Sequence, residues 1–471
     1  MYGRRFTELC AWIIFAVAAF PRVGAGQESP ADPVRAAVER RNAGDLTGAV
    51  QLLRHRLDEA PSDAQAIRLL AQTLYWLKQF DHARSMYDTA LTRHPDNVAI
   101  RLEYARMLAD LGEVAAARVV LTPLSGSPSP EARDLLRELA LATAPWLRVG
   151  FEAAHDDQPL NRLSPSFEAG VFLTPGWTLA VGGRSDSYRS GDSLSRSAQS
   201  GEVRLKGYLA VTRLEIELSG GGFHRSFGGS SGDWTARVQG GFRLPGHLTI
   251  GGRAERKPYH YTTASLTIPI MVRELTALAA LDDHSGWLGE AALSRMRYPD
   301  GNIVTSGYAW LMGPMLNTRT ATFSVGYSFS AQNARESRFV LANPSQAPPP
   351  GSAGFDLTGR YVPYYTPDHV VAHSVIGSLV LHSGARTTIS ANGGWAFSAH
   401  EHAPEFTVSG APPAVQAGTV RRSFTPWNAR LAIGRTLATG WSVHAHAEHG
   451  RTAFYAASTA GVEMVFRFPR G

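Results

Sequence analysis

The sequence has a single cysteine, Cys10, which lies in an apolar run at the N-terminus. Once that run is cleaved as a secretory signal, no thiol remains, which excludes disulfides and thiolate metal sites. Charged residues are also scarce, at 18% against about 25% in an average soluble protein. Long apolar runs are missing: the run from Leu9 to Phe20 has 12 residues, too few to span a bilayer as a helix. A mean hydropathy of −0.15 likewise excludes a bundle of membrane helices.

The first residues have the parts of a signal peptide. Arg4 and Arg5 form a positive start before the apolar core, and Val23 and Ala25 are small residues at −3 and −1 of a cut after position 25. Cys10 comes too early in the run to be a lipidated cysteine. We therefore expect residues 1–25 to be a cleaved signal peptide and the mature chain to reach at least the periplasm of a double-membrane bacterium.

Residues 30–143 carry an internal repeat of 34 residues. Small residues recur where two helices of a repeat cross, and prolines follow the second helix at Pro61 and Pro95. The recurring alanines are Ala37, Ala71, Ala105, Ala49, Ala83 and Ala117. This period and these small residues form the tetratricopeptide (TPR) pattern, and we assign the alanines to TPR packing. About three repeats fit, with a last helix from Pro130 to Thr143 as a cap.

From position 146 to the end, the hydrophobic period changes from helical to alternating. Leu214, Ile216 and Leu218, for example, alternate with charged residues. About sixteen such segments, many of 10 or more residues, match strands tilted across a bilayer. The predicted fold class is therefore α plus membrane β: an N-terminal tetratricopeptide α-solenoid over 30–143, then a ~16-strand antiparallel transmembrane β-barrel over 146–471. A large soluble β-sandwich is the alternative, disfavoured by so many long strands without a compact core pattern.

The connections between these segments alternate in length. Tight turns form one set, and the two longest loops, about 332–367 and 399–421, belong to the other. If the first strand leaves the periplasm after the repeats, the tight turns and both termini are periplasmic and the long loops extracellular. Trp177, Trp287 and Trp441 directly follow glycine-ended turns, where a periplasmic aromatic girdle is expected. We expect a bacterial outer-membrane protein with its repeats in the periplasm.

Charge is distributed unevenly. Residues 31–143 contain 14 Arg or Lys and 15 Asp or Glu, and residues 1–30 contribute +1, so the barrel carries the remaining +6. A basic lumen would attract an anionic solute. Alternatively, the excess of arginine reflects genome composition, or outer-loop arginines that face lipopolysaccharide phosphates.

Several polar positions alternate with apolar ones and are expected to line the lumen. His444, His446 and Glu448 share one strand face, and two histidines at that spacing suit a metal. Without a third distant ligand, a polar lumen wall is the preferred interpretation, and no metal is predicted. We expect the lumen residues either to form salt bridges across the barrel or to contact a polymer. The candidates are Arg184, Asp186, Arg204, Arg253, Glu255, Arg430, His444, His446 and Glu448.

No nucleophile elbow, phosphate loop or paired metal motif is present, so we predict no catalytic residue and no cofactor. The stretch Tyr298–Asn302 is a good hairpin turn, with Gly301 free to adopt positive φ, and a turn with no further role is the favoured interpretation. The loop over 332–356, with Pro348 to Gly351, is long enough to cover the mouth or fold into it.

The order of signal peptide, tetratricopeptide repeats and sixteen-strand barrel resembles the outer-membrane exopolysaccharide exporters, namely the outer-membrane exporter of the cellulose-synthase operon and the poly-N-acetylglucosamine porin. Two short stretches are similar to motifs of that family: Tyr298-Pro299-Asp300-Gly301-Asn302 and Tyr364-Tyr365-Thr366-Pro367. The repeat count differs, about three here against many in the cellulose exporter. The resemblance implies a passive conduit that performs no chemistry, embedded in outer-membrane lipid. Its partners would be a polysaccharide and, through the repeats, periplasmic or inner-membrane synthase components, without nucleic acid.

Two other functions fit the same architecture. Surface-lipoprotein assembly modulators also pair periplasmic repeats with a barrel, and tetratricopeptide grooves commonly bind peptides. A barrel of fourteen strands would favour that function, whereas sixteen would favour polysaccharide export. A general porin or surface receptor is the third possibility, and a hydrolase assembled from scattered side chains the fourth.

Overall fold

The computed structural model describes most of the chain after its first 31 residues. The described ranges are 32–77, 79–157, 160–174, 176–191, 194–209, 214–227, 232–244, 248–283, 286–318, 320–342, 357–384, 386–409, 414–453 and 455–469. The predicted signal peptide, Lys78 and the proline-rich part of the long loop lie outside them. Among the described residues, no helix is both long enough and apolar enough to cross a bilayer.

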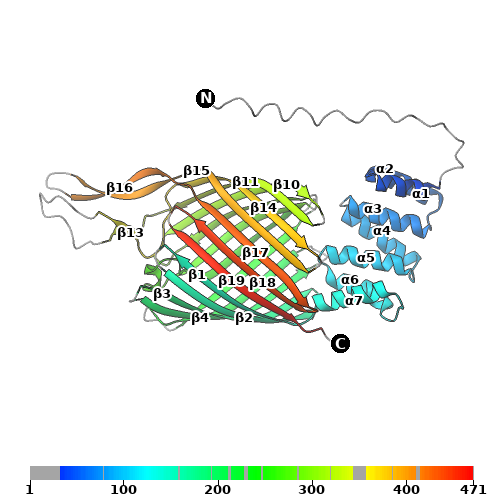
Figure 1. Cartoon of the computed structure of the whole chain (residues 1–471), viewed down its shortest axis with the longest axis horizontal. Coiled ribbons are helices and arrows are strands. Elements are labelled where there is room, and N and C mark those ends of the chain that lie inside the picture. The colour runs from blue at the N-terminus through cyan, green and yellow to red at the C-terminus, as the bar shows by residue number, and fades with distance from the viewer. Residues whose placement is uncertain are drawn as a thin grey trace, which may run out of the picture. The chain divides into compact units, whose positions relative to one another are not determined.

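Seven α-helices and a 3₁₀ helix come first among the described residues, in antiparallel pairs such as α1 with α2 and α3 with α4 (Figure 1). They are α1 (Pro33–Asn42), α2 (Leu46–Glu59), α3 (Ala64–Trp76), α4 (Phe80–Arg93), α5 (Val98–Asp110), α6 (Val114–Leu121), η1 (Thr122–Leu124) and α7 (Pro130–Ala142). Asp32, Asp45 and Asp63 cap α1, α2 and α3 by accepting backbone N–H groups. Gly44 and Gly112 adopt φ values of 87° and 78°, a left-handed conformation that favours glycine. The predicted tetratricopeptide-type helical region is confirmed.

The alanines assigned to packing lie inside these helix pairs. Ala49, Ala71, Ala83, Ala105 and Ala117 are 0% exposed, and Ala37 is 1% exposed. A methyl group at these points lets the two helix backbones approach closely. The residues that fill the remaining space are larger, such as Tyr87 and Leu53, each 1% exposed.

The chain divides into two compact units, Met1–Glu103 and Tyr104–Gly471. The second unit contains α6, α7 and all the strands. Within it, the end of α7 contacts the barrel: Arg467 Nη1 donates to the Ala142 carbonyl at 3.0 Å, and Phe468 N–H to the Pro145 carbonyl at 2.9 Å. The boundaries 1–25, 30–143 and 146–471 remain predictions.

Sixteen antiparallel strands close into a barrel, because β1 pairs with β19 along its whole length. They are β1 (Trp146–Asp156), β2 (Leu160–Thr174), β3 (Trp177–Ser190), β4 (Leu194–Leu209), β5 (Leu214–Arg225), β6 (Gly232–Arg243), β7 (Leu248–Pro258), β8 (Met271–Asp283), β9 (Trp287–Arg297), β10 (Ile303–Asn317), β11 (Ala321–Ala334), β14 (Val370–Ser383), β15 (Thr387–Ser409), β17 (Trp427–Ala438), β18 (Trp441–Arg451) and β19 (Ala456–Arg467). The predicted sixteen-strand barrel is confirmed.

In the described part of the chain, three further strands lie outside the closed ring. β16 (Ala414–Ser423) pairs with the second half of β15, while the first half of β15 pairs with β17. The stretch 399–421, expected to be a loop, is therefore largely a hairpin that prolongs β15. Its residues Phe406 and Val408 pair with Ala417 and Val415, side chains that suit strands. The short strands β12 (Phe339–Leu341) and β13 (Gly359–Tyr361) pair with each other inside the long loop.

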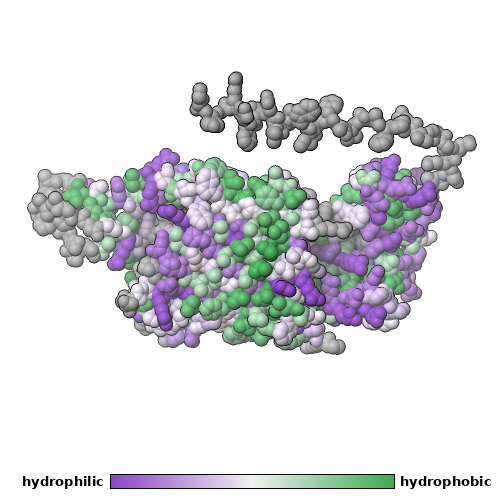
Figure 2. All heavy atoms as spheres, viewed as in Figure 1, coloured by the Kyte–Doolittle hydropathy of each residue, from purple (hydrophilic) through white to green (hydrophobic). Residues whose placement is uncertain are grey.

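Alternate side chains divide the barrel into an apolar outer face and a polar inner face. Phe151, Phe167, Leu275, Leu293 and Leu431 are outward and between 47% and 62% exposed. Figure 2 shows hydrophobic residues gathered over the strands of the visible face, with hydrophilic residues toward the ends. Such a surface is stable only against lipid, and this fold places the protein in the outer membrane.

The two ends of the barrel differ, as the sequence predicts. At the α7 end, the connections are short, such as those between β2 and β3 and between β17 and β18. Trp177, Trp287 and Trp441 are the first residues of β3, β9 and β18 at this end, where Trp177 covers Gly207 and Trp287 covers Gly313. At the opposite end lie the 12-residue connection from β7 to β8 and the long connection from β11 to β14. The α7 end therefore faces the periplasm.

Candidate functional site

The inner wall of the barrel carries a ladder of alternating charges. It starts at Glu463 on β19, which pairs with Arg148 on β1 at 3.4 Å, and Arg148 in turn contacts Glu168 on β2 at 3.6 Å. Arg204 on β4 reaches Glu168 at 2.8 Å, passing over β3. The residues of β3 nearest this path are Ala180 and Gly182, which are small enough to leave room for the guanidinium.

The ladder continues across the next strands. Glu217 on β5 forms ion pairs with Arg204 at 3.7 Å and with Arg237 on β6 at 3.8 Å. Arg237 also pairs with Glu255 on β7 at 3.1 Å. Lys257 then bridges Glu255 at 2.5 Å and Glu274 on β8 at 2.6 Å. Each of these cations has carboxylates on both sides, so this half of the wall is charge-balanced rather than basic.

The structure places all nine predicted lumen residues on the inward face, and seven of them form ion pairs. Arg204, Arg253 and Glu255 belong to the ladder, where Arg253 contacts Glu255 at 3.8 Å. Arg184 pairs with Asp186 at 2.8 Å and with Glu152 at 3.2 Å. Arg430 pairs with Glu448 at 3.8 Å.

The two histidines lie on the same part of the wall as two of these arginines. Arg184, Arg430, His444 and His446 line one cavity of about 710 Å³ on the inner side of β1, β17 and β18. His444 Nε2 lies 3.2 Å from Ser442 Oγ, and the His446 ring packs against Gly461. The polymer-contact role assigned to these residues remains a prediction.

The extracellular mouth is crossed by the connection between β7 and β8, residues 259–270. It contains the 3₁₀ helix η2 (Ala264–Leu266), and Leu266 is 0% exposed. Leu266 packs in one cluster with Leu160, Tyr188, Ala198 and Phe223, which lie on β2, β3, β4 and β5. This connection therefore folds inward across the barrel instead of projecting from it.

His260 holds the same connection to the inner wall. Its Nδ1 lies 3.1 Å from Tyr188 Oη, and its ring contacts those of Phe223 and Phe227 at 5.3 Å and 5.7 Å between centroids. Burial, together with the charges of Arg225 and Arg162, outweighs the opposing effect of Asp186 and lowers the pKa of His260 to about 4. The imidazole is therefore neutral when the connection is docked.

The long connection between β11 and β14 is anchored by two sequence motifs that meet in space. Tyr364 stacks on Tyr298, with ring centroids 3.5 Å apart and planes at 12°. The Tyr364 hydroxyl donates to Asp300 at 2.7 Å, and Arg338 donates to the same carboxylate at 2.8 Å. We call Tyr298, Asp300, Asn302, Arg338 and Tyr364 the clamp.

Asn302 completes the clamp from a fully buried position. Its side-chain amide donates to the Glu336 carbonyl at 2.9 Å, and its side-chain oxygen accepts from the Glu336 N–H at 3.1 Å. Gly301 adopts a φ of 85°, as predicted. The stretch 298–302 is therefore more than a turn: it fixes the path of a loop that follows it by more than thirty residues.

The charges of the clamp stabilise one another. Burial alone would raise the pKa of Asp300, but the hydrogen bonds from Tyr364 and Arg338 outweigh it and hold that pKa below its usual value. Burial and the bond to Asp300 raise the pKa of Tyr364 to about 12. The carboxylate is therefore ionised and the phenol protonated at neutral pH, as their hydrogen bond requires.

The two inward connections touch each other over the mouth. The Thr262 hydroxyl donates to the Pro363 carbonyl at 2.7 Å, and the Tyr365 N–H donates to the Tyr259 hydroxyl at 3.3 Å. On the opposite side, the Tyr365 hydroxyl lies 3.5 Å from Glu401 of β15. Residues 362–366 thus span from the β7–β8 connection to β15, and together the two connections narrow the pore.

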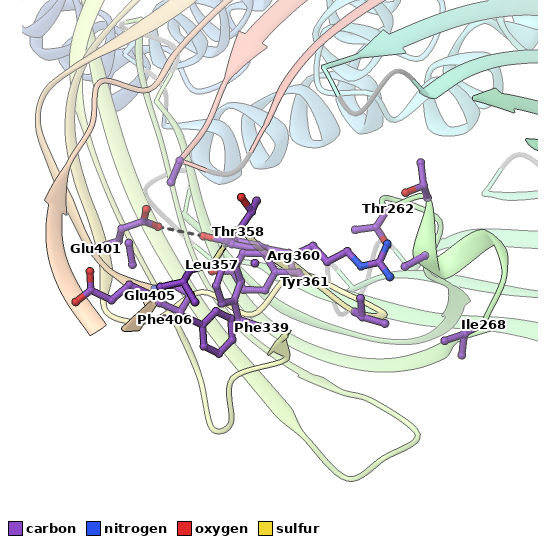
Figure 3. A pocket seen from close by; sticks show the side chains of 18 of the residues that line it. Thr262, Ile268, Phe339, Leu357, Thr358, Arg360, Tyr361, Glu401, Glu405 and Phe406 are labelled. Carbon is purple, nitrogen blue, oxygen red and sulfur yellow. Dashed lines mark hydrogen bonds between the residues drawn. The ribbon is translucent and has the colours of Figure 1, made fainter. Parts of the chain in front are cut away.

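A cavity of about 1030 Å³ lies between these connections and the β15–β16 hairpin. Phe339 stacks on Phe406 at 5.4 Å, and Tyr361 packs edge-on against Phe339 and Tyr365. Figure 3 shows Phe339, Tyr361 and Phe406 together on one side, with Arg360 extended toward the side of Thr262. Aromatic faces beside paired charges suit a ligand with both apolar and hydroxyl surfaces.

The sequence did not predict two further features of the structure. The first is the docking of residues 259–270, which the sequence indicates only weakly, through apolar residues such as Leu266 and Ile270 in a connection between two strands. The second feature is a group formed by Asp368, His369 and His402, whose ligand atoms all lie within 4.8 Å of one another. The adjacent Asp368-His369 pair was its signal, but the position of His402 depends on the extension of β15. This group, rather than His444 and His446, has the ligand number expected of a metal site.

In the repeats, polar side chains of α1, α3 and α5 contact one another. In the first unit, Arg41 of α1 donates to Gln72 of α3 at 2.5 Å and lies over the Trp76 ring at 4.7 Å. Arg68 of α3 pairs with Glu103 of α5 at 2.5 Å. Burial and, after it, the charge of Arg68 lower the pKa of Arg41.

Comparison with known proteins identifies the repeats by sequence and several barrels by shape. Residues 78–139 match the tetratricopeptide repeat family. Similar solved structures include a bacterial polysaccharide outer membrane secretin, with 10% identity and a TM-score of 0.49 over 69% of this chain and 99% of that chain. CdiB from Acinetobacter baumannii has 9% identity and a TM-score of 0.40 over 69% of this chain and 60% of that chain. OmpT of Vibrio cholerae, as a loop L8 deletion mutant, has 10% identity and a TM-score of 0.32 over 69% of this chain and 98% of that chain.

No curated protein matches the chain in sequence. The described residues thus combine tetratricopeptide-type helices with a sixteen-strand barrel of the outer-membrane type.

Proposed function

We propose that this protein is an outer-membrane channel through which an exopolysaccharide leaves the cell, and that its barrel performs no catalysis. The observation that carries the proposal is the inner wall, where arginine and lysine side chains alternate with carboxylates from β19 through β8. Such a wall offers many hydrogen-bonding groups and little net charge. It supports weak, repeated contacts with a hydroxyl-rich polymer, since a strongly charged wall would hold an oppositely charged chain in place.

The balance of charges on the inner wall indicates which class of polymer the channel suits. The net charge of +6 suggested an anion-attracting lumen as one possibility. In the ladder, however, Arg148, Arg204 and Arg237 each contact two or more carboxylates. A neutral or mostly neutral glycan therefore suits the described wall better than a polyanion.

The repeats would receive the polymer or dock the proteins that deliver it. Their surface includes Arg41, Arg68 and Trp76, which present charge, hydrogen-bond donors and an aromatic face. Periplasmic or inner-membrane synthase components are the partners that this role requires.

Assembly of surface lipoproteins or secreted proteins is the second candidate function. Tetratricopeptide grooves that bind peptides favour it, but the count of sixteen strands favours polysaccharide export. A general porin or surface receptor is a third candidate. The inward packing of Leu266 and the clamp on the described ends of the β11–β14 connection argue against a permanently open porin.

Conductance of the refolded full-length protein in planar bilayers tests the proposal. Neutral and anionic glycan oligomers are added from the periplasmic side, and we expect reversible block by a neutral class. The variant Arg430→Gln, on the cavity wall, should weaken that block, whereas Arg189→Gln, exposed on the outer face of β3, should leave it unchanged. A channel that conducts but ignores every glycan would contradict the proposal and favour protein clients.

A further inference from the structure

Three arginines lie side by side on the outer face of the barrel at its extracellular end. Arg256 on β7 is the direct partner of Arg273 on β8, and Arg273 is the direct partner of Arg297 on β9. We call these residues the arginine row. Arg295 lies two residues below Arg297 on the same face, opposite Leu275. Like charges directly opposite one another destabilise a sheet unless an anion lies between them.

Within the arginine row, Arg256 has a carboxylate partner among the described residues, and Arg273 and Arg297 do not. Asp233 pairs with Arg256 at 2.7 Å, and Glu336 lies 3.5 Å from the neighbouring Arg335. No ion pair within the described part of the chain involves Arg273, Arg295 or Arg297, and all three are exposed. Three guanidinium groups thus face outward without a partner among the described residues.

The depth of the row places it at the boundary between lipid and headgroups. β9 runs from Trp287 at the periplasmic girdle to Arg297. At about 3.3 Å per residue and a tilt of about 40°, this length rises about 25 Å, the height of the apolar band of an outer-membrane barrel. Trp234, beside the row and 55% exposed, has Arg256 over its ring at 4.2 Å, and an aromatic residue is expected at this level.

A groove descends the outer face directly below the row. It has a volume of about 1060 Å³, and its floor includes Gly240, Gly252, Ala254 and Ala277, with Leu275 and Leu293 beside them. Arg295 and Arg335 stand at its upper end. Small side chains make the wall concave where the neighbouring outer face is covered by larger apolar residues.

We propose that this surface is a binding site for lipopolysaccharide of the outer leaflet. The phosphates of its lipid A would bind Arg273, Arg295 and Arg297, and an acyl chain would occupy the groove below. Guanidinium groups bind phosphate through paired hydrogen bonds, and they do so more strongly where water is excluded. The site rests on the outer-membrane location of the barrel and is independent of what passes through the pore.

Binding of purified lipid A to the refolded full-length protein in detergent tests this site, with the apparent Kd taken from the shift in thermal unfolding. The test variant is Arg273→Gln/Arg295→Gln/Arg297→Gln. The control, Arg189→Gln/Arg421→Gln/Arg451→Gln, removes the same charge from three exposed arginines outside the row. We expect the test variant to bind bis-phosphorylated lipid A at least tenfold more weakly than the native protein, and the control to bind it within twofold.

Two further ligands identify the chemistry. Dephosphorylated lipid A should bind the native protein at least tenfold more weakly, because the phosphates are missing, and phosphatidylglycerol should bind more weakly than lipid A. Equal binding by test variant and native protein, or by phosphorylated and dephosphorylated lipid A, would overturn the proposal. Phosphatidylglycerol binding as tight as that of lipid A would overturn the assignment to lipopolysaccharide. If the triple variant does not fold, Arg273→Gln and Arg297→Gln are measured singly.

Discussion

Single residues decide how the long connection is held at the mouth. Tyr364 and Asp300 are 64 residues apart in sequence, yet they form the hydrogen bonds at the centre of the clamp. The sequence identified both stretches as similar to family motifs but did not show that they meet. They are separated by two barrel strands and a loop, and no local pattern shows that the loop after β11 folds back onto the turn between β9 and β10.

Removing the Asp300 charge should loosen this connection. In Asp300→Asn, the Arg338 guanidinium loses one of its two carboxylate partners and keeps Glu336, while the Tyr364 hydroxyl loses its charged acceptor. A hydrogen bond to a charged group contributes about 1.5–3 kcal/mol when buried, and less at a partly exposed site such as this one. We expect conductance to rise severalfold in planar bilayers, and Tyr364→Phe to reproduce most of the effect.

The matched control is Asp282→Asn, which removes a charge from an exposed position near the periplasmic end of β8. It should leave conductance unchanged. If Asp300→Asn conducts like the native protein while remaining folded, the clamp does not restrict the pore.

The alanines of the repeats can be tested by overpacking. Ala71 in α3 is 0% exposed, so Ala71→Leu should destabilise the helical region by about 1–3 kcal/mol. The readout is the helical circular dichroism signal of the full-length protein during chemical denaturation. Ala99→Leu, at an exposed position in α5, serves as the control and should change the transition little. Equal effects of the two substitutions would contradict the assigned packing role.

At the scale of elements, the β7–β8 connection should respond to pH through His260. Its pKa is about 4 when docked and about 6.5 when exposed. Between these values the released form binds more protons than the docked form, so docking weakens as the pH falls from about 6.5 to about 4. The shift corresponds to at most about 3 kcal/mol.

We therefore expect conductance to increase as the extracellular solution is taken from pH 7 to pH 4.5. His260→Gln keeps a polar group near Tyr188 but does not titrate, so it should remove most of this dependence. A pH response of equal size in His260→Gln would assign the response to other groups. The increase should reverse when the pH returns to 7, which separates undocking from irreversible unfolding.

For most helices and strands, local sequence patterns are enough to predict the structure. A period of 34 residues predicts the helix pairs, and alternation predicts the strands, because each depends on neighbours close in the sequence. The inward path of residues 259–270 depends instead on contacts of Leu266 with four other strands, which no local pattern contains. The extension of β15 was missed for a similar reason, since a hairpin outside the membrane has no lipid-facing stripe.

For the whole molecule, the paired charges predict a weakly selective pore. A wall in which cations and carboxylates alternate should discriminate little between small ions, so we expect a permeability ratio of K⁺ to Cl⁻ within about threefold of unity. Arg204 contacts Glu168, Glu202 and Glu217. Replacing it in Arg204→Gln leaves these carboxylates without that cation and should shift the reversal potential toward cation selectivity.

The reversal potential is measured across a KCl gradient, with Arg189→Gln as an outer-face control that should leave selectivity unchanged. Strong anion selectivity in the native protein would contradict the charge balance. Composition alone could not predict that balance: a net charge of +6 counts the residues, but only strand register decides which cations lie opposite carboxylates.

Barrel closure also sets an order of events during biogenesis. The first strand, β1, has its partner in the last, β19, so the ring cannot form until the final residues have crossed the inner membrane. The helices of residues 33–142 leave the translocon long before that, and their contacts are local enough to form early. The repeats are thus in place, with time to recruit a partner, while the strands still await their last neighbour. Any complex that they nucleate is older than the pore.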